Sequence, residues 1–136
     1  FEETMRLYPP VPILSRQAKH EDVIRRRKIP AGSIMLVVPW LLHRHKDYWE
    51  QPDAFDPGRF DTENGKQGLR SAFIPFSAGP RVCPGAGFAM VEGPLLLAQL
   101  LRSYRVTALP DRIPQPVAHL TVRAKNGIWL TLKPRD

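Results

Sequence analysis

The sequence predicts an α+β fold in which helices pack beside several small sheets. Three observations predict it: short β-branched segments within residues 13–38, a long proline- and glycine-rich stretch over 47–78, and a mostly apolar helical stretch over 86–102. A length of 136 residues suffices for one small domain. The 15 prolines, about twice average usage, indicate irregular connections held by tertiary contacts.

The N-terminal part is predicted to hold a helix followed by short strands. Residues 1–7 are helical in pattern and must stop before Pro9-Pro10, because the residue before a proline is pushed out of the α region. We expect strands over 13–19, 22–26 and 33–38, with a turn at Pro30-Ala31-Gly32.

The C-terminal part is predicted to hold a long helix and a hairpin. Residues 86–102 are apolar on nearly every side, which is typical of a helix buried all round. Gly93-Pro94 within this stretch predicts a kink or a restart, because proline removes a backbone hydrogen bond. Residues 121–124 and 128–132 alternate about Lys125-Asn126-Gly127 and predict a β-hairpin.

Residues 47–78 show little periodicity and many Pro, Gly, Asp and Phe residues. A structureless stretch of that length is uncommon inside a compact domain and is usually functional. We therefore expect an irregular segment that serves a site.

The formal net charge of +7 raises the question of a nucleic-acid partner. The basic residues are scattered except for Arg25–Lys28, and no DNA- or RNA-binding signature is present, so we expect none. That run is interpreted as the solvated face of a strand or turn. An acidic protein partner or a dianionic cofactor would explain the positive bias equally well.

Cysteine and histidine usage excludes two kinds of site. The single cysteine rules out an internal disulfide. The four histidines show no metal-ligand spacing, and we expect no zinc at His20, His43, His45 or His119.

Residues 76–85 concentrate residue types suited to holding a thiolate ligand. They read Phe-Ser-Ala-Gly-Pro-Arg-Val-Cys-Pro-Gly and lead directly into the apolar helix. A helix N-terminus and a nearby cation favour a thiolate, and N–H groups close to the sulfur tune a metal–thiolate bond. Glycines before and after the cysteine would permit tight turns and such an approach. A buried, inert thiol is the commoner role of a lone cysteine, but it does not explain this grouping.

This segment matches all six fixed positions of F-x-x-G-x-R-x-C-x-G, the haem-binding signature of the cytochromes P450, and the chain resembles that family. The resemblance implies haem b as cofactor, with Cys83 as the axial iron ligand. It also implies that Arg81 contacts a haem propionate. The residues that shape the proximal loop would be Phe76, Gly79 and Gly85.

The resemblance runs from Glu3 to the end of the chain and implies the C-terminal part of the cytochrome P450 fold. That part consists of the end of the E-x-x-R helix, small β-sheets, an irregular meander, the cysteine loop, a long buried helix and a C-terminal β-hairpin. The first residues read as a helix already under way. We therefore expect residues 1–136 to be a portion of a single domain whose N-terminal and oxygen-binding-helix regions are missing.

An ion-pair trio is implied by two further motifs. Glu3 and Arg6 match the E-x-x-R pair, and residues three apart lie on one helical face. Arg59, in Pro57-Gly58-Arg59-Phe60, matches the arginine that completes the pair, although Gly58 stands where the family usually has an acid. The trio would hold the meander, and thereby the cysteine loop, in place.

Other positions are assigned by the resemblance alone. Arg16 would reach the edge of the haem. Substrate contacts would come from residues before the first strand and from a hairpin near the C-terminus: Val11, Ile13, Leu14, Leu120 and Thr121. Ordinary core packing is an equally good interpretation of these five.

The resemblance implies a haem-dependent monooxygenase that inserts one oxygen atom of O2 into an apolar organic substrate. Electrons would come from NAD(P)H through a ferredoxin or a flavoprotein reductase, which Arg70 and Lys66 would help to dock. We expect a cytoplasmic location. A haem-thiolate peroxygenase, isomerase or dehydratase would share these motifs, and a chain of this length could fail to bind haem alone.

Overall fold

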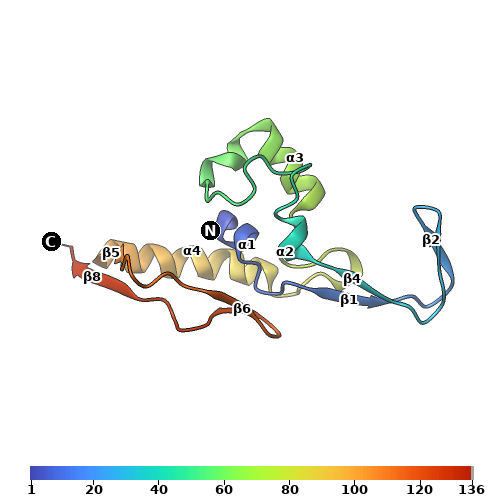
Figure 1. The fold of residues 1–136 in the computed structure, drawn as a ribbon. Helices are drawn as coiled ribbons and strands as arrows, with labels where there is room; N and C mark the ends of the chain where they lie inside the picture. The colour runs from blue at the N-terminus through green and yellow to red at the C-terminus, as the bar shows by residue number, and fades with distance from the viewer. Residues whose placement is uncertain (136) are drawn as a thin grey trace.

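The structure, a computed structural model, describes residues 1–135 and confirms the α+β class. The chain forms helices and four separate two-stranded antiparallel sheets (Figure 1). The sheets are nested in pairs, because β2 and β3 lie between β1 and β4 in the chain, and β6 and β7 lie between β5 and β8. The helical elements are α1 (Glu2–Leu7), α2 (Pro39–Leu42), η1 (Pro57–Asp61), α3 (Glu63–Ala72), η2 (Gly79–Arg81) and α4 (Ala86–Ser103). The strands are β1 (Leu14–Gln17), β2 (Asp22–Ile24), β3 (Arg27–Ile29), β4 (Ile34–Val37), β5 (Tyr104–Ala108), β6 (Pro116–Ala118), β7 (Val122–Ala124) and β8 (Leu130–Pro134).

The N-terminal elements follow the predicted order. Helix α1 ends before the Pro9-Pro10 pair, as predicted, and β1 pairs with β4 in an antiparallel ribbon. Strand β2 is two residues shorter than predicted and pairs with β3. Arg25 and Arg26 leave the strand because both have positive φ, 48° and 64°, and form the turn. The basic run from Arg25 to Lys28 is exposed, as expected.

The segment 47–78 is more ordered than its sequence suggests. It contains η1 and the ten-residue helix α3, whose N-cap Thr62 accepts a hydrogen bond at Oγ1 from the Gly65 N–H at 3.0 Å. The buried positions of α3 are Gly65, Gly68 and Ala72. Gly65, Gly68, Leu69 and Ala72 recur at helical spacing, but three of the four are glycine or alanine, whose small side chains carry little apolar signal, and this helix was not predicted.

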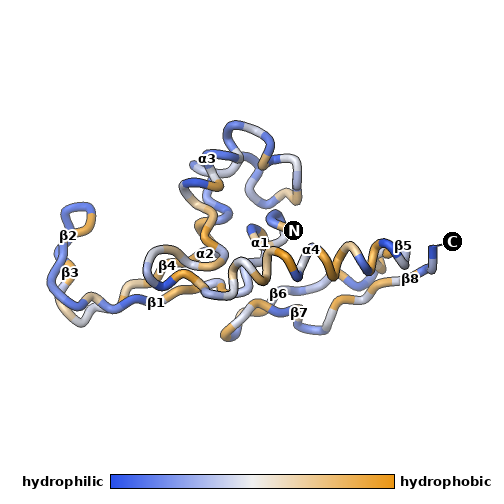
Figure 2. Tube along the Cα trace, turned by 180° about the vertical axis from the view of Figure 1, so that it is seen from behind, coloured by the Kyte–Doolittle hydropathy of each residue, from blue (hydrophilic) through white to orange (hydrophobic). Residues whose placement is uncertain are grey.

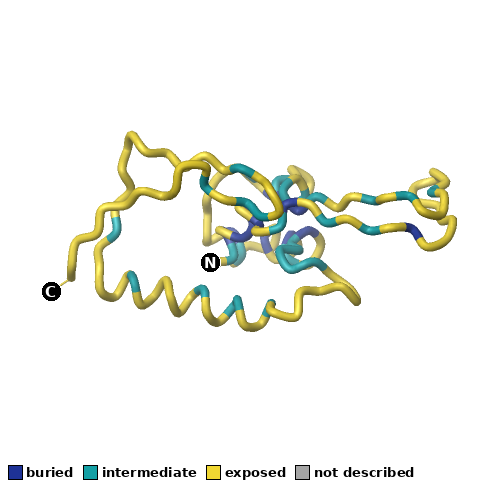
Figure 3. The backbone as a smooth tube through the Cα atoms, turned by 90° about the horizontal axis from the view of Figure 1, so that it is seen from below, coloured by how far each residue is buried: buried dark blue, intermediate teal, exposed yellow. Residues whose placement is uncertain are grey.

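Helix α4 is continuous through Pro94, so the predicted restart is wrong. The expectation of a helix buried on every side is also wrong for this chain, because none of its 18 residues is buried. Its apolar residues are exposed or half-buried, with Phe88, Leu95 and Leu96 at 69%, 63% and 65% exposed, and the colouring of Figures 2 and 3 follows this along the helix. The chain covers the helix at few points, one of them Gly93, over which the ring of Phe1 lies.

The predicted hairpin joining 121–124 to 128–132 does not form. β7 pairs with β6 through a short turn at residues 119–121, and β8 pairs with β5, the strand that directly follows α4. Gly127 does adopt the left-handed conformation, with φ 78°, and Trp129 Nε1 donates to the Asn126 carbonyl at 2.9 Å. This turn directs the chain away from β7 and toward β5.

The core lies around α1 and is small. Its buried apolar members include Met5, Leu7, Trp49 and Ala72, and charged or polar side chains are buried beside them. Within residues 1–135, no helix is both long enough and apolar enough to cross a membrane.

Candidate functional site: the cysteine loop and its support

The Cys83 thiol lies exposed in the loop that leads into α4. The loop is closed by two backbone hydrogen bonds, from the Cys83 N–H to the Phe76 carbonyl at 2.9 Å and from the Val82 N–H to the Gly79 carbonyl at 3.0 Å. The Ala86 N–H donates to the Cys83 carbonyl at 3.2 Å and starts the helix. The backbone therefore fixes the position of Cys83 while its sulfur faces solvent.

The two glycines of the loop serve different purposes. Gly79 has φ 69°, a left-handed backbone conformation that is unfavourable for residues with a side chain. Gly85 has φ −84°, which any residue adopts, so it is not needed for a tight turn. A Cβ at Gly85 would instead lie 3.7 Å from Cys83 Sγ, so its absence leaves one side of the sulfur open.

Arg16 is hydrogen-bonded to this loop. From β1, its Nη2 donates to Ser77 Oγ at 2.8 Å and its Nη1 donates to the Ser15 carbonyl at 2.8 Å. Ser77 itself has φ 66°, a strained backbone conformation for a residue with a side chain. Arg81 is exposed and forms no ion pair within residues 1–135.

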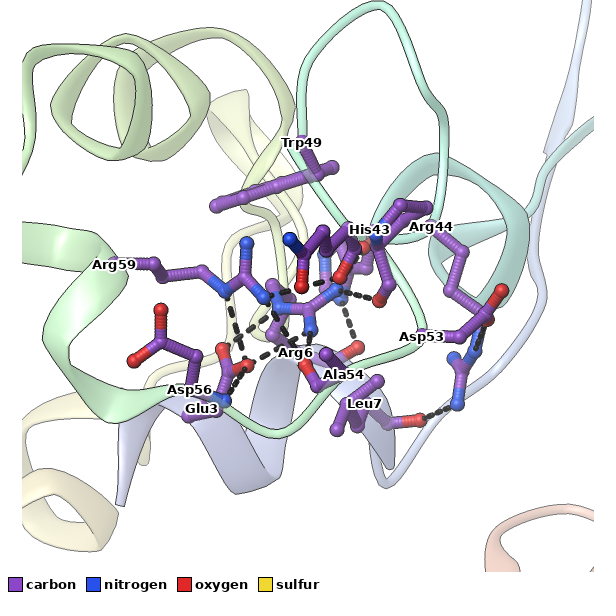
Figure 4. A network of polar contacts seen from close by, with 12 residues as sticks. Glu3, Arg6, Leu7, His43, Arg44, Trp49, Asp53, Ala54, Asp56 and Arg59 are labelled. Atoms are coloured by element: carbon purple, nitrogen blue, oxygen red, sulfur yellow. Dashed lines mark hydrogen bonds and ion pairs between the residues drawn. The ribbon is translucent and has the colours of Figure 1, made fainter.

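The structure brings Glu3, Arg6 and Arg59 together in a buried network (Figure 4). Arg6 donates two hydrogen bonds to the Glu3 carboxylate, from Nε to Oε2 at 2.7 Å and from Nη2 to Oε1 at 2.8 Å. Arg59 Nε adds a bond to Oε1 at 3.0 Å, and the Asp56 N–H adds one at 2.9 Å. Burial raises the pKa of the Glu3 carboxyl, but these hydrogen bonds outweigh burial and bring the pKa below its usual range.

The same two guanidinium groups hold the irregular segment that follows α2. Their remaining N–H groups donate to five backbone carbonyls, those of His43, Glu50, Gln51, Pro52 and Ala54, at 2.6–3.2 Å. No buried side-chain nitrogen or oxygen among the described residues lacks a partner. The segment is therefore shaped by α1 and η1 rather than by its own secondary structure.

His43 connects this network to the residues before the cysteine loop. Its side chain is fully buried, Nε2 accepts from the Ile74 N–H at 2.9 Å, and Nδ1 lies 3.2 Å from the Arg6 carbonyl. Both bonds form together only in a neutral ring that carries its proton on Nδ1. Burial, with a smaller effect of the Arg6 and Arg44 charges, lowers the pKa of His43 to about 4.

Comparison with known proteins identifies the family. The cytochrome P450 family model matches residues 1–131. The chain is 42% identical over 135 residues to human cytochrome P450 4B1 and 44% identical over 136 residues to human cytochrome P450 4F2, covering 98% of this chain and 26% of each relative. The chain belongs to the cytochrome P450 family.

Solved P450 structures share this fold. The haem domain of cytochrome P450DA superposes with a TM-score of 0.89 at 28% identity, covering 99% of this chain and 30% of that one. The cyanobacterial CYP120A1 with bound retinoic acid gives 0.91 at 27% identity, covering 98% and 31%. The chain thus spans about a quarter of the length of its curated relatives.

The residues of the cysteine loop fit a haem ligated through sulfur. The only cysteine of the sequence is exposed, and Gly85 has no side chain where one would approach the sulfur. Arg81 lies in the loop and Arg16 is hydrogen-bonded to it, and neither has an acidic partner within residues 1–135. Two apolar residues that flank Cys83 in the sequence, Val82 and Phe88, are 51% and 69% exposed. Cys83 would hold the iron of a P450 haem here, and Arg81 and Arg16 would hold its carboxylates.

The predicted substrate contacts separate into two groups. Ile13 lines an apolar groove of about 320 Å³ formed by the segment before β1, the start of α2 and the β6–β7 hairpin. The other lining residues are Pro12, Val38, Trp40, Leu41, Pro116, Val117, Ala118 and Val122. The Val122 N–H donates to the Pro10 carbonyl at 2.9 Å and joins these walls. Val11, Leu14 and Thr121 are half-buried outside this lining, and Leu120 is 87% exposed at the hairpin tip.

The supporting residues that sequence reasoning missed are His43, Trp49 and the glycines of α3. The Trp49 ring lies against Gly68, where an added Cβ would come within 2.8 Å of it, and Arg6 lies over the same ring at 5.4 Å. The spacing of Gly65, Gly68 and Ala72 places all three on one face of a helix and was the available signal.

Proposed function

We propose that the protein is a haem-dependent monooxygenase that transfers one oxygen atom of O2 to an apolar organic substrate. The observation that carries this proposal is the exposed Cys83 thiol, held by backbone hydrogen bonds in a loop that matches the P450 signature. When bound through a thiolate, haem activates O2 for insertion into unreactive C–H bonds.

The chain's own residues would hold and orient the cofactor. Cys83 would supply the axial sulfur, Arg81 and Arg16 would neutralise the propionates, and Phe76 would border the loop on the proximal side. The bond from Arg16 to Ser77 supports a preformed position for that arginine before the cofactor binds. The Glu3, Arg6 and Arg59 network would keep the meander in register with this loop.

The substrate class is proposed from the apolar groove. Its lining offers no charged side chain and includes the aliphatic residues Ile13, Val117 and Val122. An apolar substrate or an apolar part of one would be admitted beside these residues.

Electrons would come from NAD(P)H through a ferredoxin or a flavoprotein reductase. Of the two cations expected to meet this partner, Lys66 already pairs with Glu63 at 2.9 Å, whereas Arg70 is exposed with no ion pair in residues 1–135. Arg70→Gln is therefore expected to slow reduction of the haem more than Lys66→Gln does. Lys46→Gln, which removes an exposed cation outside α3, is the control. Equal reduction rates in all three variants would refute this docking role.

The reduced, carbon-monoxide-bound absorption spectrum of the haem-loaded protein tests the ligand. A thiolate-ligated haem gives a band far to the red of a histidine-ligated one, and Cys83→Ala should abolish it. Ser71→Ala, an exposed small residue on α3, should leave it unchanged. Retention of the red-shifted band in Cys83→Ala would refute the assignment.

Turnover distinguishes oxygen chemistry from related haem-thiolate chemistry. Product formation that requires NAD(P)H, a redox partner and O2, with one labelled oxygen atom recovered in the product, is the expected outcome. Product formation with peroxide alone would identify a peroxygenase, and rearrangement without any oxidant would identify an isomerase.

A further inference from the structure

Both asparagines of the chain, Asn64 and Asn126, are followed directly by glycine. An Asn-Gly pair can react without an enzyme, because the glycine nitrogen can attack the side-chain carbonyl carbon of the asparagine. Glycine has no side chain to obstruct this attack, and its backbone rotates more freely than that of any other residue. The surroundings of each pair therefore decide whether it reacts in the folded protein.

The fold protects Asn64, although its side chain is exposed. Asn64 lies in the first turn of α3, and helical side chains point toward the N-terminus of the helix, away from the nitrogen of the next residue. Its Oδ1 accepts from the Glu50 N–H at 3.4 Å, and the Gly65 N–H donates to Thr62 Oγ1 at 3.0 Å. Gly65 is packed so closely that an added Cβ would lie 1.8 Å from the Arg59 carbonyl oxygen. Reaction at Asn64 therefore requires α3 to open.

Asn126 lies in an open connection between β7 and β8, and residues 125–129 of this connection are all exposed. Within residues 1–135 the side-chain amide of Asn126 forms no hydrogen bond. The Gly127 N–H donates to the Ala124 carbonyl at 3.4 Å, which is longer than the usual range of about 2.7–3.2 Å. An added Cβ at Gly127 would meet nothing closer than Trp129 Nε1 at 3.9 Å. The Gly127 nitrogen is therefore weakly held and has room to move.

We propose that Asn126 is a site of spontaneous deamidation and that the fold protects Asn64 from the same reaction. The Gly127 nitrogen gives its proton to hydroxide and forms a bond to Asn126 Cγ, while the side-chain nitrogen takes a proton from water and leaves as ammonia. Water then opens the resulting succinimide ring at either of its carbonyl groups, which leaves aspartate or isoaspartate at this position. Water is the only co-reactant, and nothing is oxidised or reduced. This inference does not depend on the proposed catalytic function.

Isoaspartate would change the path of the main chain into β8. The chain would run through the former side chain of Asn126, which adds a methylene group to the connection. The Asn126 carbonyl, which accepts from Trp129 Nε1 at 2.9 Å, would become a free carboxylate outside the main chain. Leu130, the first residue of β8, pairs with Ala108 of β5 directly after this turn. We therefore expect the β5–β8 pairing to weaken at this end.

Peptide mass spectrometry of the haem-loaded protein, sampled during incubation at neutral pH, measures both sites in one experiment. Conversion at Asn126 should be at least about tenfold faster than at Asn64, because Asn64 reacts only after α3 opens and an opening free energy of about 1.4 kcal/mol gives that ratio. N126Q should abolish the signal from this turn, since ring closure through the longer glutamine side chain is much slower. N64Q is the matched control and should leave conversion at Asn126 unchanged. Equal rates at the two asparagines in the folded protein would overturn the proposal.

Incubation of the same protein in urea separates the effect of the fold from that of neighbouring residues. Both sites present the same Asn-Gly pair, so their rates should approach each other once the chain is unfolded. If the ratio in urea equalled the ratio in the folded protein, the protective role of α3 would be wrong. If both asparagines reacted in urea and neither reacted in the folded protein, Asn126 would not be a deamidation site.

Hydrogen–deuterium exchange tests the expected effect on β8. Amides 128–132 should exchange faster in wild-type protein that contains isoaspartate than in fresh protein. N126Q that has been incubated for the same time should show no such change. Isoaspartate formation with unchanged exchange at these amides would overturn the predicted weakening of the β5–β8 pairing.

Discussion

The buried neutral His43 makes the stability of the protein depend on pH. Its pKa is about 4 in the folded protein and about 6.5 in an unfolded chain. Between these values only the unfolded chain binds the proton, so stability is fully present above pH 6.5 and falls as the pH drops toward 4. The whole effect corresponds to about 3 kcal/mol, of which about 2 kcal/mol is lost between pH 7 and pH 5.

Urea unfolding at pH 7, 6 and 5 measures this loss. His43→Gln removes the titration while retaining one donor and one acceptor for the Arg6 carbonyl and the Ile74 N–H, so its stability should vary less with pH by about 2 kcal/mol over this range. His20→Gln, an exposed histidine, should behave as the wild type does. If His43→Gln and the wild type lost stability in parallel, the neutral, buried state of His43 would be wrong.

Three substitutions test the packing that supports the cysteine loop, each by thermal or urea unfolding. Gly65→Ala would place a Cβ 1.8 Å from the Arg59 carbonyl oxygen and should cost about 1–3 kcal/mol, whereas Gly87→Ala, with no atom within 4 Å, should gain up to about 1 kcal/mol. Arg59→Leu leaves a buried carboxylate short of a partner and should cost about 3–5 kcal/mol, against less than about 1 kcal/mol for Lys66→Gln in an exposed pair. Trp49→Ala removes a side chain that is 1% exposed and should cost about 3–5 kcal/mol. Equal losses of stability in Gly65→Ala and Gly87→Ala, or in Arg59→Leu and Lys66→Gln, would contradict the packing described.

The parts of the site that the sequence predicted are those fixed by local rules. The start of α4 after Cys83, the end of α1 before Pro9 and the shared face of Glu3 and Arg6 all follow from spacing along one segment. The resemblance of residues 57–60 to a second motif of the family added Arg59, which lies 56 residues from Glu3 and which spacing alone cannot pair.

The parts that were not predicted depend on contacts between distant segments. Nothing in the local sequence marks His43, whose role depends on its contacts with the Arg6 carbonyl and the Ile74 N–H. The periodicity of α3 is weakly apolar because its buried positions are glycine and alanine. The apolar pattern of α4 predicted burial, but such a pattern indicates only that the helix requires other segments to pack against its apolar faces. Residues 1–135 supply few of them.

Arg6 and Arg59 hold the irregular segment between α2 and η1 through its backbone, and this affects how the sequence of the segment can vary among related chains. Their N–H groups bind backbone carbonyls, which every amino acid possesses, so these hydrogen bonds do not depend on the side chains at Glu50, Gln51 and Ala54. Related chains should therefore differ freely at Glu50, Gln51 and Ala54, while loss or gain of one residue there would shift the carbonyls out of reach. For residues 50–54 the length of the chain, and not the chemical character of its side chains, should be the inherited property.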